Sequence, residues 1–289
     1  MSRPTPTKTI VITGASDGIG AAAARQLHAN GHRVVIVGRS PRKTRAVAGE
    51  LGVDCHVADF ARLDDVRRLA ADLHAAYPRI DVLANNAGGV FGDHAKTVDG
   101  VEKTFQVNHL APFLLTKLLL DKLIASRASV IQTSSVGARL VGRLVIDDLE
   151  HDRDFTPERA YGTAKLANIL FTRELHARFH DQGISGAAFH PGNVASSFGA
   201  KSDSLTGRIA RNRLARVFFV SPEKGADQLV WLAEGAPGKD WHSGVYYEKR
   251  KPARRVNKQS TDNALAHEFW NRTETLLASA GQVGGVSDR

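Results

Sequence analysis

Short runs of apolar, often β-branched residues alternate along the chain with longer segments of helical periodicity. Most of these runs lack a polar residue at every second position, which is typical of strands covered on both faces. The predicted strands are Thr9–Thr13, Arg33–Val37, Val53–Val57, Asp81–Ala84, Ser129–Thr133, Gly186–His190 and Gly244–Tyr247. The predicted helices are Gly18–Asn30, Leu63–Ala76, Asn108–Ser126, Arg159–His180, Glu223–Glu234 and Asp262–Ala280.

This alternation of strands and helices predicts an α/β fold with a Rossmann-type, doubly wound parallel sheet. No repeat, low-complexity segment or linker divides the 289 residues, so we expect a single domain over residues 1–289. Residues 1–8 and 281–289 are expected to form flexible termini.

The chain carries 39 Lys+Arg and 30 Asp+Glu, a formal net charge of +9. Such an excess is compatible with nucleic-acid binding, with an anionic small ligand or with a solvated surface. Many of the cations gather in residues 208–216 and 249–258, without the interleaved aromatic residues of a nucleic-acid groove. We therefore interpret the charge as solvated surface and expect no nucleic-acid partner.

Cysteine content and hydropathy bear on the compartment. Cys55 is the only cysteine, so no disulfide can form within the chain. The first nine residues lack the apolar core of a signal peptide, and no stretch reaches the roughly 18 to 20 apolar residues of a membrane span. We expect a cytoplasmic protein without a membrane anchor, and we assign no metal site.

The first predicted strand runs into three glycines, Gly14, Gly18 and Gly20, followed by an alanine-rich helix. Gly14 allows a tight turn, Gly18 lets the backbone approach a pyrophosphate, and Gly20 lets the helix lie close to the sheet. The helix N-terminus then offers N–H groups to phosphate. The spacing is G-x-x-x-G-x-G rather than G-x-G-x-x-G, and a glycine turn without a ligand is the alternative. We interpret the segment as a dinucleotide site.

Residues after the next strands refine this prediction. Arg39 stands where an NAD-preferring site usually has a carboxylate, and its guanidinium can pair with a 2′-phosphate, which favours NADP(H). A surface arginine in a turn is the alternative. Asp59 is expected to accept from the adenine amino group, with turn or helix capping as a rival. The segment Asn85–Gly88 would let adenosine lie against the backbone, unless it is only an Asn-rich turn.

Tyr161 and Lys165 are predicted to lie one helical turn apart on one face. A lysine ammonium beside a phenol lowers the pKa of the phenol, so that it can exchange a proton with a carbonyl or alcohol oxygen near neutral pH. The Y-x-x-x-K spacing alone is weak evidence, because a helix surface often produces it by chance.

Taken in order, T-G-x-x-x-G-I-G, N-N-A-G, a later Asn, a Ser at a strand end, Y-x-x-x-K and P-G resemble the short-chain dehydrogenase/reductase family, over residues 9 to about 280. The resemblance implies hydride transfer between nicotinamide and an alcohol or carbonyl carbon. It implies that Tyr161 is the general acid/base, and that Lys165 lowers its pKa and holds the nicotinamide ribose. Ser135, rather than Ser134, would hydrogen-bond the substrate oxygen, and Asn108 would hold a water of the proton relay.

The resemblance also completes the cofactor site. Pro191-Gly192 and the residues that follow would flank the nicotinamide, with Ser196 where the family often has Thr. The expected cofactor contacts are Gly14, Ser16, Asp17, Gly18, Ile19, Gly20, Arg39, Asp59, Phe60, Asn86, Ala87, Gly88, Tyr161, Lys165, Pro191, Gly192, Val194 and Ser196.

The gap of 26 residues between Ser135 and Tyr161 is longer than in most members of the family. Together with the residues that follow Lys165 and with H-P-G at 190–192, it resembles the retinol-dehydrogenase-like branch. Several such relatives carry an N-terminal membrane anchor that this chain does not show, so a retinoid substrate does not carry over. Specificity is expected to reside in Gly89–Asp99, Gly137–Ala160 and a substrate lid at 197–219.

The sequence therefore predicts an NADP(H)-dependent reductase of ketones or aldehydes that acts on a bulky, apolar small molecule. The alternatives are a catalytically silent NADP(H)-binding sensor, and an epimerase or dehydratase on the same fold. A homo-oligomer is compatible with the sequence. We assign no role to His109, because buried packing explains it as well.

Overall fold

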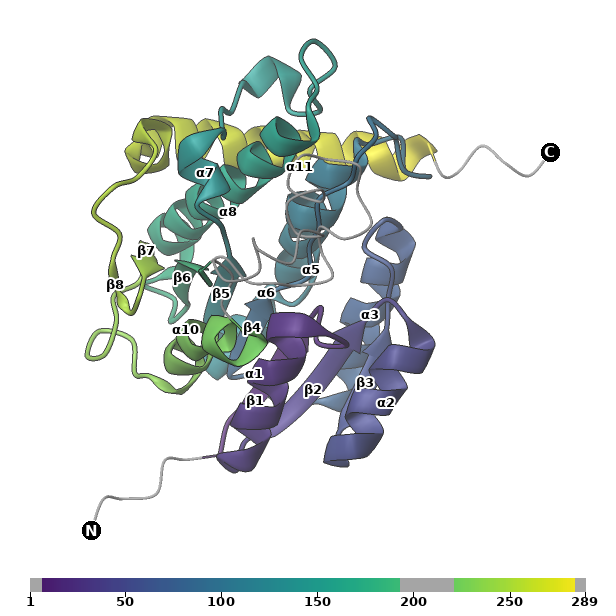
Figure 1. Ribbon diagram of the computed structural model, residues 1–289, viewed down its shortest axis with the longest axis vertical. Coiled ribbons are helices and arrows are strands. Elements are labelled where there is room, and N and C mark those ends of the chain that lie inside the picture. Colours follow the sequence, from purple (N-terminus) through teal and green to yellow (C-terminus); the bar gives the residue numbers. More distant parts are fainter. Residues whose placement is uncertain (1–6, 193–220, 284–289) are drawn as a thin grey trace, which may run out of the picture.

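An eight-stranded sheet forms the centre of the protein, with helices on both faces (Figure 1). The computed structural model describes residues 7–192 and 221–283, with side chains up to residue 280. Strands β1 to β7 are parallel in the order β3-β2-β1-β4-β5-β6-β7, and β8 pairs antiparallel with β7. The predicted Rossmann-type sheet in a single domain is confirmed. The strands are β1 (Thr9–Thr13), β2 (Arg33–Gly38), β3 (Asp54–Val57), β4 (Val82–Asn85), β5 (Ser129–Thr133), β6 (Ser185–His190), β7 (Val245–Glu248) and β8 (Lys251–Pro252).

The sheet divides the core into two layers. Ile10 and Ile12 of β1 pack with α1 (Gly18–Ala29) and α10 (Pro222–Glu234) on one face. Val11 packs on the other face, where α3 (Leu63–Ala76) and α8 (Pro157–Phe179) lie. Since both faces of the strand are buried, consecutive apolar residues each contribute, at roughly 1.5–3 kcal/mol for a fully buried Val or Ile. The lack of alternation in the sequence follows from this arrangement.

Helix α2 (Pro41–Leu51) was not predicted. It begins after Ser40, whose hydroxyl accepts from the Lys43 N–H at 3.4 Å, and Pro41 occupies its first turn. Only three of its 11 residues are buried, so the helix covers little of the core.

The prediction of one continuous helix over Asn108–Ser126 was wrong, because the segment is divided into several helices. The Asn108 side chain donates to the Thr104 carbonyl at 2.8 Å and so competes with the backbone ladder. Pro112 has no N–H, so the carbonyl four residues earlier has no α-helical donor. The segment consists of α4 (Lys103–Phe105), the π-helix η1 (Gln106–Leu110), α5 (Ala111–Leu118) and α6 (Leu120–Ser126).

The last helix, α11 (Asn263–Val283), runs across α8 (Figure 1). Its Trp270 stacks on Phe171 of α8, with ring centroids 5.4 Å apart, and meets Phe113 of α5 edge-on at 4.7 Å. These contacts extend the core of the second layer. The remaining short elements are α7 (Gly137–Leu140), η2 (Ile146–Asp148) and η4 (Lys258–Thr261).

Near the N-terminus, Lys8 donates from Nζ to the carbonyls of Ala233 and Glu234, at 2.8 and 3.0 Å, and so ties the start of β1 to the end of α10. Residues 1–6 and 284–289 of the predicted flexible termini lie outside the described residues, as does the predicted lid at 197–219. Among the helices that the structure describes, none is long and apolar enough to cross a membrane.

Candidate active site

The turn between β1 and α1 is shaped by its glycines. Gly14 has φ +67°, and a Cβ placed on it would lie 2.8 Å from the Ala87 Cα. A Cβ on Gly20 would lie 2.5 Å from the Gly14 carbonyl oxygen. Side chains are thus excluded from a backbone cradle at the helix N-terminus, at the carboxyl ends of β1 and β4. This arrangement fits the pyrophosphate of a dinucleotide.

Asn86 holds this turn in place. Its Nδ2 donates to the carbonyl of Thr13 at 3.0 Å, and its Oδ1 accepts from the Thr133 hydroxyl at 3.3 Å. The Thr13 hydroxyl in turn accepts from the N–H groups of Asn86 and Ala87, both at 3.0 Å. The ends of β1, β4 and β5 are therefore joined by one buried network, and the side chain of Asn86 is engaged within the protein.

Charged side chains lie at the ends of β2 and β3. Arg39 follows β2 and is exposed, and none of the described residues forms an ion pair or hydrogen bond with its side chain. Asp17 caps α1 by accepting from Gly18 N–H and pairs with Lys43 Nζ at 2.6 Å. The Asp59 carboxylate accepts from the Ala61 N–H at 3.0 Å, so the turn that sequence analysis left as a rival does form. The adenine contact of Asp59 remains a prediction.

Ser135 and Tyr161 come together despite the long gap between them. Ser135 follows β5, and its Oγ accepts from the Gly137 N–H at 3.2 Å. Tyr161 lies in the first turns of α8, a helix capped by the Thr156 hydroxyl. Burial raises the pKa of Tyr161, while a hydrogen bond with Ser135 acts in the opposite direction.

Lys165 is buried one turn further along α8. Its Nζ donates to the Thr133 carbonyl at 3.2 Å and lies 5.4 Å from the centroid of the Tyr161 ring. Burial lowers the pKa of Lys165 to about 7. Burial raises the pKa of Tyr161 in the protein without cofactor, and the lowering contribution expected of a charged Lys165 remains a prediction.

Asn108 completes the group of four predicted catalytic residues. Its Nδ2 donates to the carbonyls of Gly89 and Thr104, both at 2.8 Å, and its Oδ1 accepts from the Gly89 N–H at 3.0 Å. A Cβ on Gly88 would collide with Asn108 Oδ1 and lie 3.0 Å from Lys165 Nζ. Asn108 and Lys165 therefore flank Gly88, which places Asn108 beside the predicted catalytic residues.

The end of β6 braces the Ser135 loop through a residue that sequence analysis named only as part of the H-P-G motif. His190 Nδ1 accepts from the Val136 N–H at 3.3 Å. Burial lowers the pKa of His190 to about 4, so the ring is a neutral acceptor near neutral pH. Pro191 and Gly192 follow it directly, and Gly192 has φ +87°. Val194 and Ser196 lie outside the described residues.

The long insert, defined here as Gly137–Ala160, is held from the C-terminal side of the chain. Asn257 Nδ2 donates to the carbonyls of Ala138 and Gly142, at 2.8 and 2.7 Å. The side-chain amide of Gln259 bonds both the N–H and the carbonyl of Leu144, at 3.0 and 2.8 Å.

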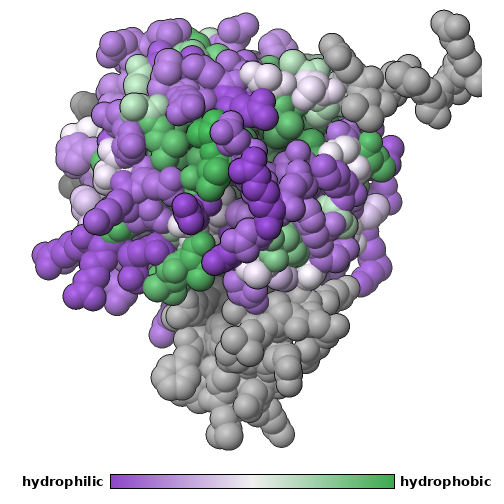
Figure 2. All heavy atoms as spheres, turned by 90° about the horizontal axis from the view of Figure 1, so that it is seen from above, coloured by the Kyte–Doolittle hydropathy of each residue, from purple (hydrophilic) through white to green (hydrophobic). Residues whose placement is uncertain are grey.

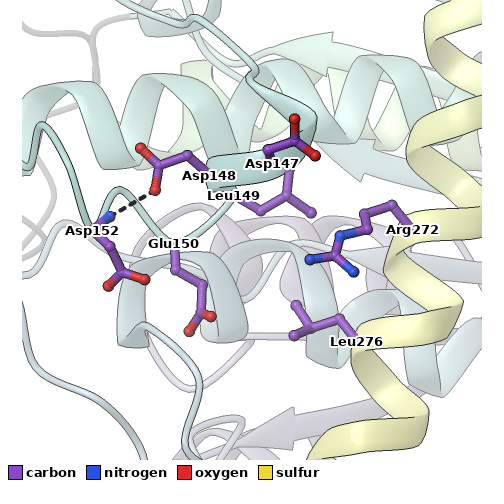
Figure 3. A pocket seen from close by; sticks show the side chains of 7 residues that line it. All are labelled: Asp147, Asp148, Leu149, Glu150, Asp152, Arg272 and Leu276. Atoms are coloured by element: carbon purple, nitrogen blue, oxygen red, sulfur yellow. Dashed lines mark hydrogen bonds between the residues drawn. The ribbon is translucent and has the colours of Figure 1, made fainter.

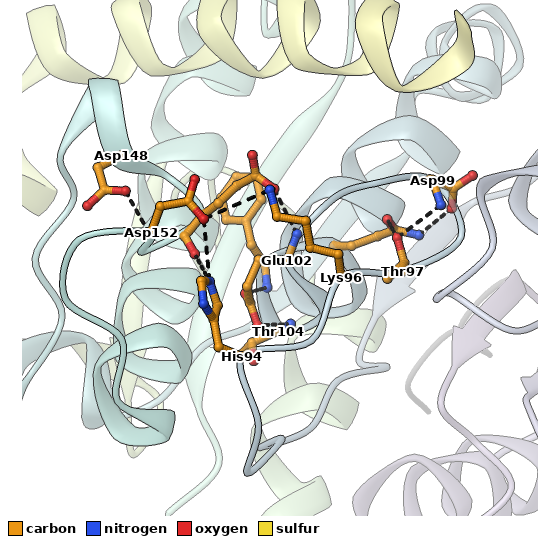
Figure 4. A network of polar contacts seen from close by, with 11 residues as sticks. His94, Lys96, Thr97, Asp99, Glu102, Thr104, Asp148 and Asp152 are labelled. Carbon is orange, nitrogen blue, oxygen red and sulfur yellow. Dashed lines mark hydrogen bonds and ion pairs between the residues drawn. The ribbon is translucent and has the colours of Figure 1, made fainter. Parts of the chain in front are cut away.

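On its other side the insert meets the first of the predicted specificity segments, as Figure 4 shows. His94 Nε2 lies 3.0 Å from the Glu150 carbonyl, and Lys96 Nζ lies 3.7 Å from the Glu150 carboxylate and 3.9 Å from that of Asp152. The Glu102 N–H donates to Glu150 Oε1 at 2.9 Å. Two of the three segments expected to control specificity are thus linked to each other.

The insert also borders α11, with a crevice of about 130 Å³ between them (Figure 3). Arg272 of α11 faces the acidic end of the insert, and Leu149 and Leu276 form its apolar lining. The acidic residues that line it are Asp147, Asp148, Glu150 and Asp152. Among the described residues, no group of three or more His, Cys, Asp or Glu side chains is arranged to hold a metal ion.

A family model described as short chain dehydrogenase matches residues 8–205. The chain belongs to the short-chain dehydrogenase family. The predicted family resemblance is confirmed, and the protein is an oxidoreductase that acts on alcohol or carbonyl groups.

Individual relatives are similar over nearly the whole chain. A protein of Streptomyces sp. strain C5, named by inference as the daunorubicin C-13 ketoreductase DnrU, is 41% identical over 98% of this chain and 94% of its own length. Human retinol dehydrogenase 13 is 34% identical, over 94% of this chain and 85% of its own.

Solved structures share the fold of this short-chain dehydrogenase. An uncharacterized protein from Mycobacterium paratuberculosis superposes with a TM-score of 0.73 at 30% identity, covering 95% of this chain and 96% of its own. A short chain dehydrogenase from Shigella flexneri, complexed with NADP, has a TM-score of 0.66 at 23% identity, covering 85% of this chain and 98% of its own.

Proposed function

We propose that the protein is an NADP(H)-dependent reductase of ketones or aldehydes, with Tyr161 as its acid/base. The observation that carries this proposal is the convergence of Ser135, Tyr161 and Lys165 at the carboxyl end of β5. These groups lie on the same sheet edge as the glycine cradle, as a dinucleotide laid across the strand ends requires.

The cofactor, when bound, supplies or accepts the hydride. The Ser135 and Tyr161 hydroxyls hold the substrate oxygen between them. Because burial raises the pKa of Tyr161, the phenol keeps its proton until a more basic oxygen develops on the substrate. Tyr161 then donates its proton to that oxygen, and Lys165 stabilises the phenolate that remains. In the oxidative direction the same proton returns from the alcohol to Tyr161.

Lys165 has a second proposed task. Its ammonium has three donors, and the Thr133 carbonyl accepts from one of them. The donors that remain fit the hydroxyl groups of a nicotinamide ribose. With a pKa of about 7, Lys165 exchanges protons readily near neutral pH, so it is suited to return a proton to Tyr161 after each turnover.

The choice of NADP(H) rests on Arg39. Its exposed guanidinium stands at the end of β2, where a 2′-phosphate is read in dinucleotide sites, and it forms no ion pair with any described residue. A carboxylate at this position would repel the phosphate, and none is present. The Lys43 ammonium, at the same end of the sheet, is already paired with Asp17.

The insert supports a bulky apolar substrate. Leu140, Val141 and Val145 are 63%, 41% and 39% exposed. Val141 lies against Gly162, the residue after Tyr161, where a Cβ would come within 2.6 Å of the Val141 Cγ2. Figure 2 views the molecule from above and shows groups of apolar residues among polar ones. Exposed apolar side chains beside the proposed acid/base fit an apolar substrate better than a small polar one.

A panel of bulky apolar ketones and aldehydes, followed by the loss of NADPH absorbance, tests the proposal. We expect sustained, substrate-dependent consumption of NADPH, faster with bulky apolar carbonyls than with acetone. Binding of NADPH without turnover of any carbonyl would instead identify a sensor. Conversion of substrate without net loss of NADPH would identify an epimerase or dehydratase.

A further inference from the structure

Behind Lys165 lies a buried chain of hydrogen bonds that the proposed mechanism does not use. His109 Nδ1 faces Asn168 Oδ1 at 3.2 Å, and Asn168 Nδ2 donates to the Thr133 carbonyl at 3.1 Å. The same carbonyl accepts from Lys165 Nζ at 3.2 Å. All four residues are at most 8% exposed. One carbonyl at the end of β5 therefore connects Lys165 to Asn168 and, through it, to η1.

The direction of each bond follows from that carbonyl. A carbonyl only accepts, so Asn168 must turn its amide nitrogen to Thr133 and its oxygen to His109. His109 must then carry its ring proton on Nδ1 and donate it to Asn168. Burial lowers the pKa of His109 to about 3, so the imidazole is neutral near neutral pH. Its Nε2 is left as an unprotonated acceptor.

Packing alone does not account for a histidine at this place. The His109 ring lies among Phe105 and Phe269, with centroids 5.3 and 4.8 Å away, where a phenylalanine ring would pack as well. The imidazole instead leaves Nε2 buried with no partner among the described residues, which is unfavourable. What the imidazole provides here and a phenyl ring would not is the Nδ1–H that donates to Asn168.

We propose that His109 and Asn168 are positioning residues for Lys165. Their hydrogen bonds hold the Thr133 carbonyl at the place where it accepts from the Lys165 ammonium. This inference rests on the role proposed for Lys165. Of the described elements packed against Lys165, its own helix contributes Tyr161 and η1 contributes His109 as titratable groups. β5 and the loop after β4 contribute neutral groups only. A displacement of the Thr133 carbonyl would therefore act directly on the pKa of Lys165.

Two substitutions at His109 separate packing from hydrogen bonding. His109→Phe keeps the aromatic contacts and removes the donor to Asn168. His109→Asn reduces the packing but retains an N–H at the δ position. For His109→Phe we expect kcat to fall about tenfold, since displacement of a catalytic group costs rate steeply, with little change in the KM for the carbonyl substrate. The Tm should be unchanged or higher, and His109→Asn should recover most of the lost kcat.

A second readout does not depend on turnover. The pKa of Lys165 can be followed by NMR of lysine labelled with ¹³C at Cε, in the protein without cofactor. Loss of the donor in His109→Phe releases the Asn168 side chain, which then no longer holds the Thr133 carbonyl in place. The bond from this carbonyl to the ammonium should weaken, and the pKa of Lys165 should fall. Asn168→Asp keeps the shape but adds a carboxylate beside the shared carbonyl, and should raise it.

Thr172→Val is the matched control. The Thr172 hydroxyl is buried on α8 and donates to the backbone carbonyl of Asn168 at 2.9 Å. It is not part of the hydrogen-bond chain from His109 to Lys165. This variant should lose stability without a change in kcat or in the pKa of Lys165. An unchanged lysine pKa in both His109→Phe and Asn168→Asp would overturn the inference, as would equal losses of kcat in His109→Phe and His109→Asn. If the wild-type protein reduces no carbonyl, the proposed function fails, while the titration of Lys165 still tests the hydrogen-bond chain from His109 to Lys165.

Discussion

Asn108 and Gly89 exchange two hydrogen bonds, in which the side-chain amide of one pairs with the backbone N–H and carbonyl of the other. The pair joins η1 to the loop after β4, much as a neighbouring strand would. Gly88 is consequently pressed between Asn108 and Lys165, with no space for a side chain.

Gly88→Ala should therefore damage the site more than the fold. The new methyl group collides with Asn108 Oδ1 and meets Lys165 Nζ, so we expect kcat/KM to fall at least about a hundredfold. Gly49→Ala is the control, because nothing lies within 4 Å of its Cβ position and it stands inside α2, where alanine is favoured by roughly 1 kcal/mol. Steady-state kinetics and thermal unfolding measure the two effects. Wild-type kinetics in Gly88→Ala would contradict the close packing described here.

Replacement of the proposed acid/base tests the mechanism itself. Tyr161→Phe removes the hydroxyl but keeps the ring under Lys165, so turnover should fall at least about a thousandfold. Binding of NADPH, measured by quenching of tryptophan fluorescence, should remain detectable. Near-normal turnover would show that Tyr161 is not the proton donor.

Cofactor preference should depend on Arg39. A charged hydrogen bond contributes about 1.5–3 kcal/mol, so Arg39→Ala should raise the KM for NADPH about tenfold or more and leave the KM for NADH nearly unchanged. Arg45→Ala, an exposed arginine further along α2, is the control and should alter neither. Equal KM values for NADPH before and after the change at residue 39 would remove the basis for choosing NADP(H).

Burial of Lys165 should make stability depend on pH in a defined direction. Its pKa falls from 10.5 in the unfolded chain to about 7 in the folded protein. Between these values the unfolded chain binds more protons, so this residue makes the folded protein more stable as pH rises from 7 to 10.5. Lys165→Met should remove that dependence. Its gain in Tm over the wild type should be largest at pH 7 and below and should disappear toward pH 10.5. A pH-independent difference would contradict the lowered pKa.

Sequence analysis predicted the sheet and the residues of the candidate site because both depend on local signals. Continuous apolar runs such as Thr9–Thr13 reflect burial on both faces, and Gly14 and Gly20 reflect a close approach of backbones. The spacing of Tyr161 and Lys165 reflects one turn of a helix. Each of these signals lies within a few residues of the chain.

Features created by contacts distant in sequence were missed. The π-helix at Gln106–Leu110 depends on where the Asn108 side chain finds acceptors, which its neighbours do not reveal. The raised pKa of Tyr161 depends on the depth of burial, which the Y-x-x-x-K spacing does not contain. His190 contacts the loop after β5, and Asn168 contacts β5 itself, at residues 54 and 35 positions earlier in the chain.

The hydrogen bonds that hold the insert distinguish two kinds of residue for a redesign of the substrate range: those that fix the shape of the insert and those that only present apolar surface. The side chains of Gln259 and Glu150 make the hydrogen bonds that fix the loop, so replacing either of them would cost the loop its shape. Leu140 and Val145 present apolar surface without such bonds. The insert thus has a fixed backbone with exchangeable apolar side chains at Leu140 and Val145. A combinatorial library restricted to these two positions should yield new selectivities while most of its members still fold.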